Sequence, residues 1–128
     1  MIMKKILLII IISIVSIAKG YSIESLNQMI LFQRDSVNVP EFQIAQMEMM
    51  ADYFKSHPNE YFFIGGFTSE NTPAYRVETI CEQRAQAVKK MLVEKFGVDG
   101  NYLIAIGVGV SKKSSEPDFN EKVEFFRK

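Results

Sequence analysis

Tryptophan is absent from this sequence, and cysteine and histidine each occur only once. The single cysteine, Cys81, excludes an internal disulfide, so the fold must depend on its apolar core or on a partner. One cysteine and one histidine cannot build the usual zinc ligand sets. Cys81 and His57 fall in different predicted elements with no third residue to orient them, which leaves a catalytic pair unsupported. No nucleotide-binding fingerprint occurs. We therefore expect no enzyme, no metal and no cofactor.

Net charge is also missing, because 15 basic residues balance 15 acidic ones. No basic run and no aromatic–basic stripe interrupts this balance, which disfavours nucleic acid or an anionic membrane surface as a partner. Internal repeats, low-complexity tracts and Pro/Gly-rich linkers are absent from the sequence too. The 128 residues therefore form at most one domain behind a short leader.

The N-terminus has the three parts of a secretory signal peptide. Lys4 and Lys5 precede an apolar run of 13 residues, Ile6–Ala18, and small residues follow. We predict a signal peptide over residues 1–20, cleaved after Gly20 or, alternatively, after Ala18, and a mature domain over residues 21–128. The run is shorter than the roughly 18–20 residues that span a bilayer. An uncleaved N-terminal anchor is the alternative, and it is the one route to a membrane that the sequence offers.

Hydrophobic periodicity and turn residues predict the order strand, helix, strand, helix, strand, strand. The predicted strands cover residues 29–32, 60–68, 102–108 and 120–126, and the predicted helices cover residues 40–56 and 73–96. This order indicates an α/β sandwich, a mixed four-stranded sheet with two helices packed on it. Cys81 lies on the apolar stripe of the second helix, so we expect it to be buried and inert rather than paired between chains.

Three details of these elements can be checked against a structure. On the first helix, we expect one apolar face formed by Phe42, Ala45, Met49 and Phe54. In the second strand, the pair Gly65-Gly66 predicts a bulge or a close backbone approach. In the last strand, Val123 and Phe125 alternate with Lys122 and Glu124, which is typical of a half-exposed strand. The cluster Met47, Met49 and Met50 indicates core filling, with an adaptable partner surface as the alternative.

Several motifs occur in a fixed order along residues 28–126. They are Gly66-Phe67-Thr68-Ser69, the segment from Ile80 to Val88, Gly107-Val108-Gly109, and Asn120 to Phe125. They are similar, in turn, to the Gly-(aromatic or His)-Thr-Asp signature, the Leu-Ser-x-x-Arg-Ala-x-x-Val helix, the Gly-x-Gly turn and the closing Asn-Arg-Arg-Val-Glu strand of one family. The chain thus resembles a degenerate member of the OmpA-like, peptidoglycan-associating domain family, which also occurs in peptidoglycan-associated lipoprotein and MotB. The resemblance implies the βαβαββ OmpA-like fold.

The resemblance also implies a ligand site. The family's Asp and Arg hold the zwitterionic end of diaminopimelate in the peptidoglycan stem peptide, and the step from Ser69 to Arg84 has the family's spacing of 15 residues. Arg84 can fork onto a carboxylate from an open cleft. Ser69, where the family has Asp, cannot neutralise an ammonium, which weakens binding by about ten- to a hundredfold. The candidate ligand-binding residues are Arg84, Ser69, Thr68, Glu70 and Arg76.

Each candidate has a structural alternative. Arg84 could be a salt-bridge partner, Glu70 a solvated loop acid, and Thr68 with Ser69 a side-chain-to-backbone turn. Arg76 stands where the family has Asn, and Glu121-Lys122 replaces its Arg-Arg pair. Two functions therefore remain open. The chain is either an envelope binding module with weak affinity for peptidoglycan, or a scaffold of an envelope assembly with a vestigial pocket and a protein partner. Both place it in the periplasm or at the outer membrane.

Overall fold

The computed structural model describes residues 24–128, so the predicted signal peptide and its cleavage site lie outside the described residues. The strands are β1 (Glu24–Leu31), β2 (Phe62–Thr68), β3 (Leu103–Val110) and β4 (Lys122–Arg127). The main helices are α2 (Ile44–Ser56) and α3 (Ala74–Glu94), and short 3-10 helices cover Glu41–Gln43, Gly100–Tyr102 and Pro117–Asn120. The predicted order of elements is confirmed, with β1 beginning earlier than expected.

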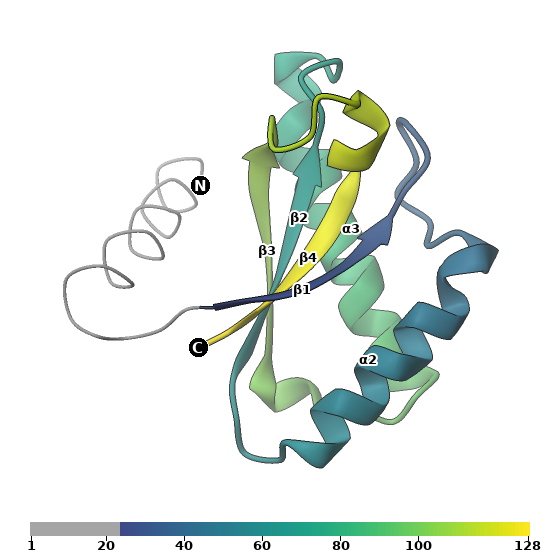
Figure 1. Ribbon diagram of the computed structural model, residues 1–128, viewed down its shortest axis with the longest axis vertical. Coiled ribbons are helices and arrows are strands. Elements are labelled where there is room, and N and C mark those ends of the chain that lie inside the picture. The colour runs from purple at the N-terminus through teal and green to yellow at the C-terminus, as the bar shows by residue number, and fades with distance from the viewer. Residues whose placement is uncertain (1–23) are drawn as a thin grey trace, which may run out of the picture.

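The four strands form one mixed sheet in the order β1-β4-β2-β3 (Figure 1). β2 runs parallel to β3, and β4 runs antiparallel to both β1 and β2. The predicted sheet with two helices is therefore confirmed, and β2 occupies the central position that its apolar sequence indicated. In the described part of the chain, no helix has the length and apolarity needed to cross a membrane.

The core lies between one face of the sheet and the two helices. Alternation along the strands turns Ile30, Ile64 and Phe125 to this face, and all three are fully buried. Helix α2 contributes Phe54, whose ring lies 5.6 Å from that of Phe125, and α3 contributes Val88, Leu92 and neighbouring side chains. This packing fixes both helices against the strands that carry the candidate site residues.

The apolar face expected on the first helix was wrong except at Phe54, which is buried; Ala45 is exposed. Phe42 is 67% exposed and Met49 is 63% exposed, whereas Met47 and Met50 are buried. The buried set of α2 follows the spacing i, i+3, i+4, i+7 from Met47, which is one continuous helical face. Phe42 lies outside that register because it belongs to the 3-10 helix that precedes α2. Core filling thus holds for two of the three methionines.

Two glycines let α3 approach the sheet closely. A Cβ on Gly66 would meet the carbonyl oxygen of Cys81 at 1.9 Å, and a Cβ on Gly107 would meet the backbone nitrogen of Glu82 at 2.7 Å. The pairing of β2 with β3 also shifts register between Gly66 and Phe67. The predicted close approach is confirmed, and so is the burial of Cys81.

The half-exposed pattern expected for the last strand was wrong as well. Lys122 is 2% exposed and Glu124 is 5% exposed. Their side chains form an ion pair at 2.5 Å, and Lys113 approaches the same carboxylate at 3.6 Å. The Lys122 ammonium also lies 5.4 Å from the centre of the Phe67 ring. Pairing and contact with an aromatic face allow these charges to be buried on β4.

Candidate functional site

Arg84 lies in the middle of α3 and is fully buried. Its Nε donates to the carbonyl of Ser36 at 2.8 Å, and its Nη2 donates to the carbonyl of Gln33 at 3.1 Å. Its Nη1 donates to the carbonyl of Phe67 at 2.9 Å and to Oε1 of Glu121 at 2.8 Å. Four of the five N–H groups of the guanidinium are therefore satisfied from within the protein. Arg84 was expected to look into an open cleft, but its side chain has no exposed surface.

The counter-ion of Arg84 is Glu121, the residue just before β4. Glu121 is also fully buried, and its second oxygen, Oε2, accepts a hydrogen bond from Oγ of Ser69 at 2.6 Å. The guanidinium carbon of Arg84 also lies over the Phe32 ring, 5.1 Å from the ring centre, which is a cation–π contact. We call Arg84, Glu121 and Ser69 the buried triad. It joins α3 to the ends of β2 and β4.

The other candidate residues lie outside the triad. Thr68 is fully buried, and its hydroxyl has no hydrogen-bond partner among the described residues. Glu70 is exposed and lies 3.8 Å from Lys112 on the loop that follows β3. Arg76 is partly exposed and lies 3.5 Å from Asp35. Exposed pairs of this kind contribute little to stability, so Glu70 and Arg76 remain available to solvent.

The sequence interpretation noted Glu121 as a departure from the family's Arg-Arg pair but did not name it as a site residue. The signal for it was two simultaneous departures from the family pattern, Ser69 in place of an Asp and Glu121 in place of an Arg. The two positions are 52 residues apart in the chain, yet their side chains are hydrogen-bonded. Considered together, they place the acid at the start of β4, whereas the family resemblance implies one directly after β2.

The geometry of the triad favours a structural role over ligand binding or catalysis. A ligand carboxylate could reach Arg84 only after Glu121 had left it, and breaking a buried ion pair costs about 3–5 kcal/mol. Within residues 24–128, no group of three or more His, Cys, Asp or Glu side chains is arranged to hold a metal ion. The triad also presents no nucleophile to solvent, because Ser69 is fully buried and donates to a carboxylate.

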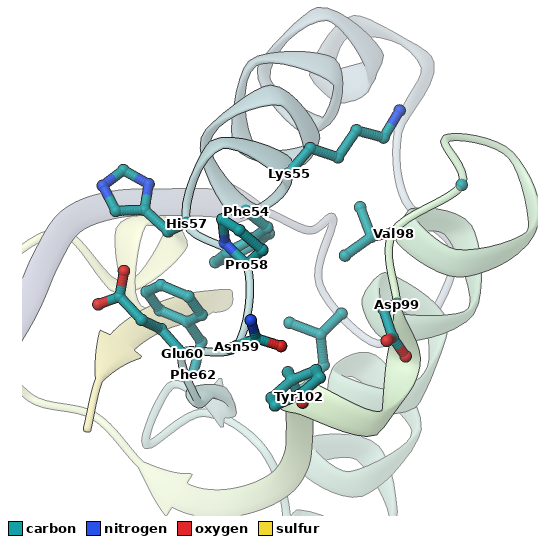
Figure 2. A pocket seen from close by; sticks show the side chains of 12 residues that line it. Phe54, Lys55, His57, Pro58, Asn59, Glu60, Phe62, Val98, Asp99 and Tyr102 are labelled. Atoms are coloured by element: carbon teal, nitrogen blue, oxygen red, sulfur yellow. The ribbon is translucent and has the colours of Figure 1, made fainter.

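A separate pocket of about 220 Å³ lies at the opposite end of β2 from Ser69. Its apolar floor includes Phe54, Phe62 and Leu103. Figure 2 shows His57 and Glu60 on one side of it and Val98 and Asp99 on the other. Asp99 accepts a hydrogen bond from the backbone of Asn101, and Glu60 lies 3.6 Å from Arg127, so both carboxylates already have partners. None of the candidate residues from the sequence lines this pocket.

A family model described as the OmpA family matches residues 31–126. Among curated proteins, outer membrane porin F of Pseudomonas aeruginosa is 35% identical over 82 residues. That match covers 63% of this chain but only 23% of the porin, so the chain spans less than a quarter of this relative's length.

Solved structures share the fold. The peptidoglycan-associated lipoprotein from Burkholderia pseudomallei superposes with a TM-score of 0.70 at 23% identity, covering 80% of this chain and 91% of that one. The C-terminal domain of Helicobacter pylori MotB superposes with a TM-score of 0.69 at 20% identity, covering 84% of this chain and 85% of that one. The family model matches three quarters of the sequence, and the fold of the chain agrees with this match. The chain belongs to the OmpA family.

Proposed function

We propose that this chain is a non-catalytic module of the cell envelope, exported by the leader over residues 1–20, that acts as an interaction scaffold. In this proposal Arg84 serves the fold, and the ligand contact that its family position implies is replaced by Glu121. The observation that carries the proposal is the complete burial of Arg84 with four internal hydrogen bonds. A guanidinium satisfied in this way gains little from a ligand carboxylate.

The alternative is weak, non-covalent association with the diaminopimelate-containing stem peptide of peptidoglycan. It is favoured by membership of the OmpA family and by the shared fold with a peptidoglycan-associated lipoprotein. In this alternative Glu121 would release Arg84 to the ligand, while Thr68, Ser69, Glu70 and Arg76 would line the remainder of the site. The released carboxylate would then have to reach solvent, because a buried unpaired charge is unfavourable.

Sedimentation with purified sacculi separates the two proposals. We expect the mature chain to stay in the supernatant, and the double variant Ser69→Asp/Glu121→Ala to sediment at least about tenfold more, the size of one charge-assisted contact. The double variant returns an acid to position 69 and removes the internal counter-ion.

The predicted cleavage after Gly20 has its own test. Mass spectrometry of the protein exported from cells should find Tyr21 as its first residue.

Glu48→Gln is the matched control, because it removes an exposed carboxylate on α2 and leaves the triad and all candidate ligand-binding residues intact. It should behave as the parent does. Thermal melts would establish that each variant is folded before it is scored. Parent protein that sediments as strongly as the double variant would contradict the scaffold proposal and support the peptidoglycan alternative.

A further inference from the structure

Several exposed charges on the two helices have no partner within the molecule. Around the strand ends and loops, by contrast, exposed charges form ion pairs, namely Arg34–Asp118, Arg76–Asp35, Lys112–Glu70 and Arg127–Glu60. Glu48 and Asp52 on α2, and Lys90 and Lys95 at the end of α3, are exposed and form no ion pair with any described residue. Charges of both signs on the helices are therefore free to pair with another molecule.

The two acids belong to one face of α2. Four exposed residues follow the spacing i, i+3, i+4, i+7, which places them on one side of the helix, and they are Ala45, Glu48, Met49 and Asp52. Met49 is 63% exposed, which is unusual for a large apolar side chain. We call these four residues the α2 face. It combines an apolar centre with two acids and no base.

A groove beside α3 has the opposite sign of charge. It measures about 460 Å³ and lies between the segment that precedes α2 and the C-terminal half of α3. Val39 and Met91, both partly buried against the core, form its apolar wall. Lys90 and Lys95 outnumber the single acid of the lining, Glu94, so the groove has a positive balance. We call it the α3 groove, and an open groove of this size admits several side chains of a helix face.

The spacing of the charges matches between the two features. Glu48 and Asp52 are about 6 Å apart along the axis of α2, and Lys90 and Lys95 are about 7.5 Å apart along α3, for a rise of about 1.5 Å per residue. Flexible lysine side chains absorb a difference of this size. The acids would repel nucleic acid and anionic lipid, whereas a second copy of this chain offers both the opposite charges and an apolar wall.

Both features lie on the helix layer, which covers one face of the sheet (Figure 1). A two-fold axis between two such layers brings the α2 face of each copy onto the α3 groove of the other, so every contact is made twice. We propose that the chain forms this two-fold homodimer, in which Glu48 and Asp52 of each copy pair with the lysines of the other. The inference goes beyond the scaffold function proposed above and uses no part of the buried triad.

Sedimentation velocity of the exported protein over a range of concentrations measures this dimer. We expect a reversible dimer with a dissociation constant of about 10–100 μM in about 50 mM NaCl, as is typical of two small, partly polar contacts. Raising the salt to about 500 mM should weaken association at least about fivefold, because exposed charge pairs are screened.

Charge reversal locates the interface. Glu48→Lys/Asp52→Lys and Lys90→Glu/Lys95→Glu should each associate with themselves at least about tenfold more weakly than the parent, because like charges then face each other. An equimolar mixture of the two variants should associate within about threefold of the parent, because each α2 face again meets a groove of opposite charge. Glu24→Lys/Glu116→Lys is the matched control. It reverses two exposed acids outside both features and should associate as the parent does.

Cross-linking tests the same contact in the unaltered protein. A zero-length carbodiimide, applied to a mixture of ordinary and heavy-isotope protein, should join Glu48 or Asp52 of one copy to Lys90 or Lys95 of the other, in peptides of mixed isotope. The proposal is overturned if the parent is monomeric at about ten times the expected dissociation constant, if no mixed cross-link joins these residues, or if the mixed variants fail to associate. Sacculus sedimentation is a separate readout, so the scaffold function and this dimer can fail independently.

Discussion

At the scale of single residues, the acid that neutralises Arg84 is Glu121, whereas the family resemblance implies an acid at position 69. The family resemblance implies an Asp at position 69 and an Arg at position 121, and this chain has Ser69 and Glu121. The Ser69 hydroxyl and the Arg84 guanidinium bond to the two oxygens of the same carboxylate. The two substitutions therefore depend on each other. Ser69 with an arginine at position 121 would leave the buried cation without a carboxylate, whereas Glu121 with an aspartate at position 69 would place two carboxylates beside one cation.

Replacing Arg84 with methionine should lower the free energy of unfolding by about 3–5 kcal/mol, because the Glu121 carboxylate would stay buried without its partner. Urea unfolding followed by circular dichroism measures this difference. The matched control is Arg76→Met. That side chain pairs with Asp35 at the surface, so its loss should change stability by less than about 0.5 kcal/mol.

A second variant separates the lost pair from lost packing. Arg84→Met/Glu121→Leu removes both charges, and it should recover much of the stability lost in Arg84→Met, since paired apolar replacements of a buried ion pair are often neutral. Arg84→Met with the stability of the parent would show that the triad does not hold the fold, which would return Arg84 to the list of ligand-binding candidates.

At the scale of elements, the contact of α3 with the sheet depends on residues without side chains. Gly66→Ala should destabilise the protein by about 3 kcal/mol or more, because the added methyl would lie 1.9 Å from a backbone oxygen that cannot move by itself. Gly100→Ala is the comparison. Its Cβ would meet a methyl of Val93 at 3.0 Å, and a side chain can rotate away, so a loss below about 1 kcal/mol is expected. Similar melting temperatures for the two variants would contradict this account.

The elements could be predicted from the sequence because the signals that define them are local. The paired glycines and the apolar runs of β2 and α3 each indicated their own element without knowledge of any partner. Phe42 was misplaced because periodicity does not report that a 3-10 helix precedes α2. Lys122 was misplaced because its burial depends on Glu124 and on the Phe67 ring, which are contacts between neighbouring side chains.

The candidate site was predicted less completely, for a related reason. Arg84 and Ser69 were found as residues, but the role of each is set by Glu121, which lies 37 positions beyond Arg84. Nothing local to Glu121 indicates that it is buried, since an acid next to a lysine at the start of a strand is ordinarily solvated. The departures from the family pattern at positions 69 and 121 were visible in the sequence. That the two side chains are in contact could be recognised only from the fold.

At the scale of the whole molecule, the helix layer and the sheet are in contact at Cys81. Cys81 is fully buried on α3, and its Sγ lies 3.5 Å from the carbonyl oxygen of Gly109 in β3. Its own backbone is the surface that Gly66 and Gly107 contact. Reagents can reach this sulfur only if α3 separates from β2 and β3. That separation would also expose Arg84 and most of the core, so it amounts to unfolding of the domain.

Alkylation of Cys81 by iodoacetamide should therefore report global unfolding. For a domain with ordinary stability of about 5 kcal/mol or more, the thiol of the native protein should react at least about a thousandfold more slowly than that of the chain in concentrated guanidinium chloride. Arg84→Met should accelerate the native reaction in proportion to its loss of equilibrium stability, because both changes measure the same opening. Phe119→Ala should leave the rate unchanged, since that ring lies on the surface. Fast labelling of the parent would mean that α3 opens locally, in which case Glu121 could release Arg84 without unfolding and the peptidoglycan alternative would gain a route to its ligand.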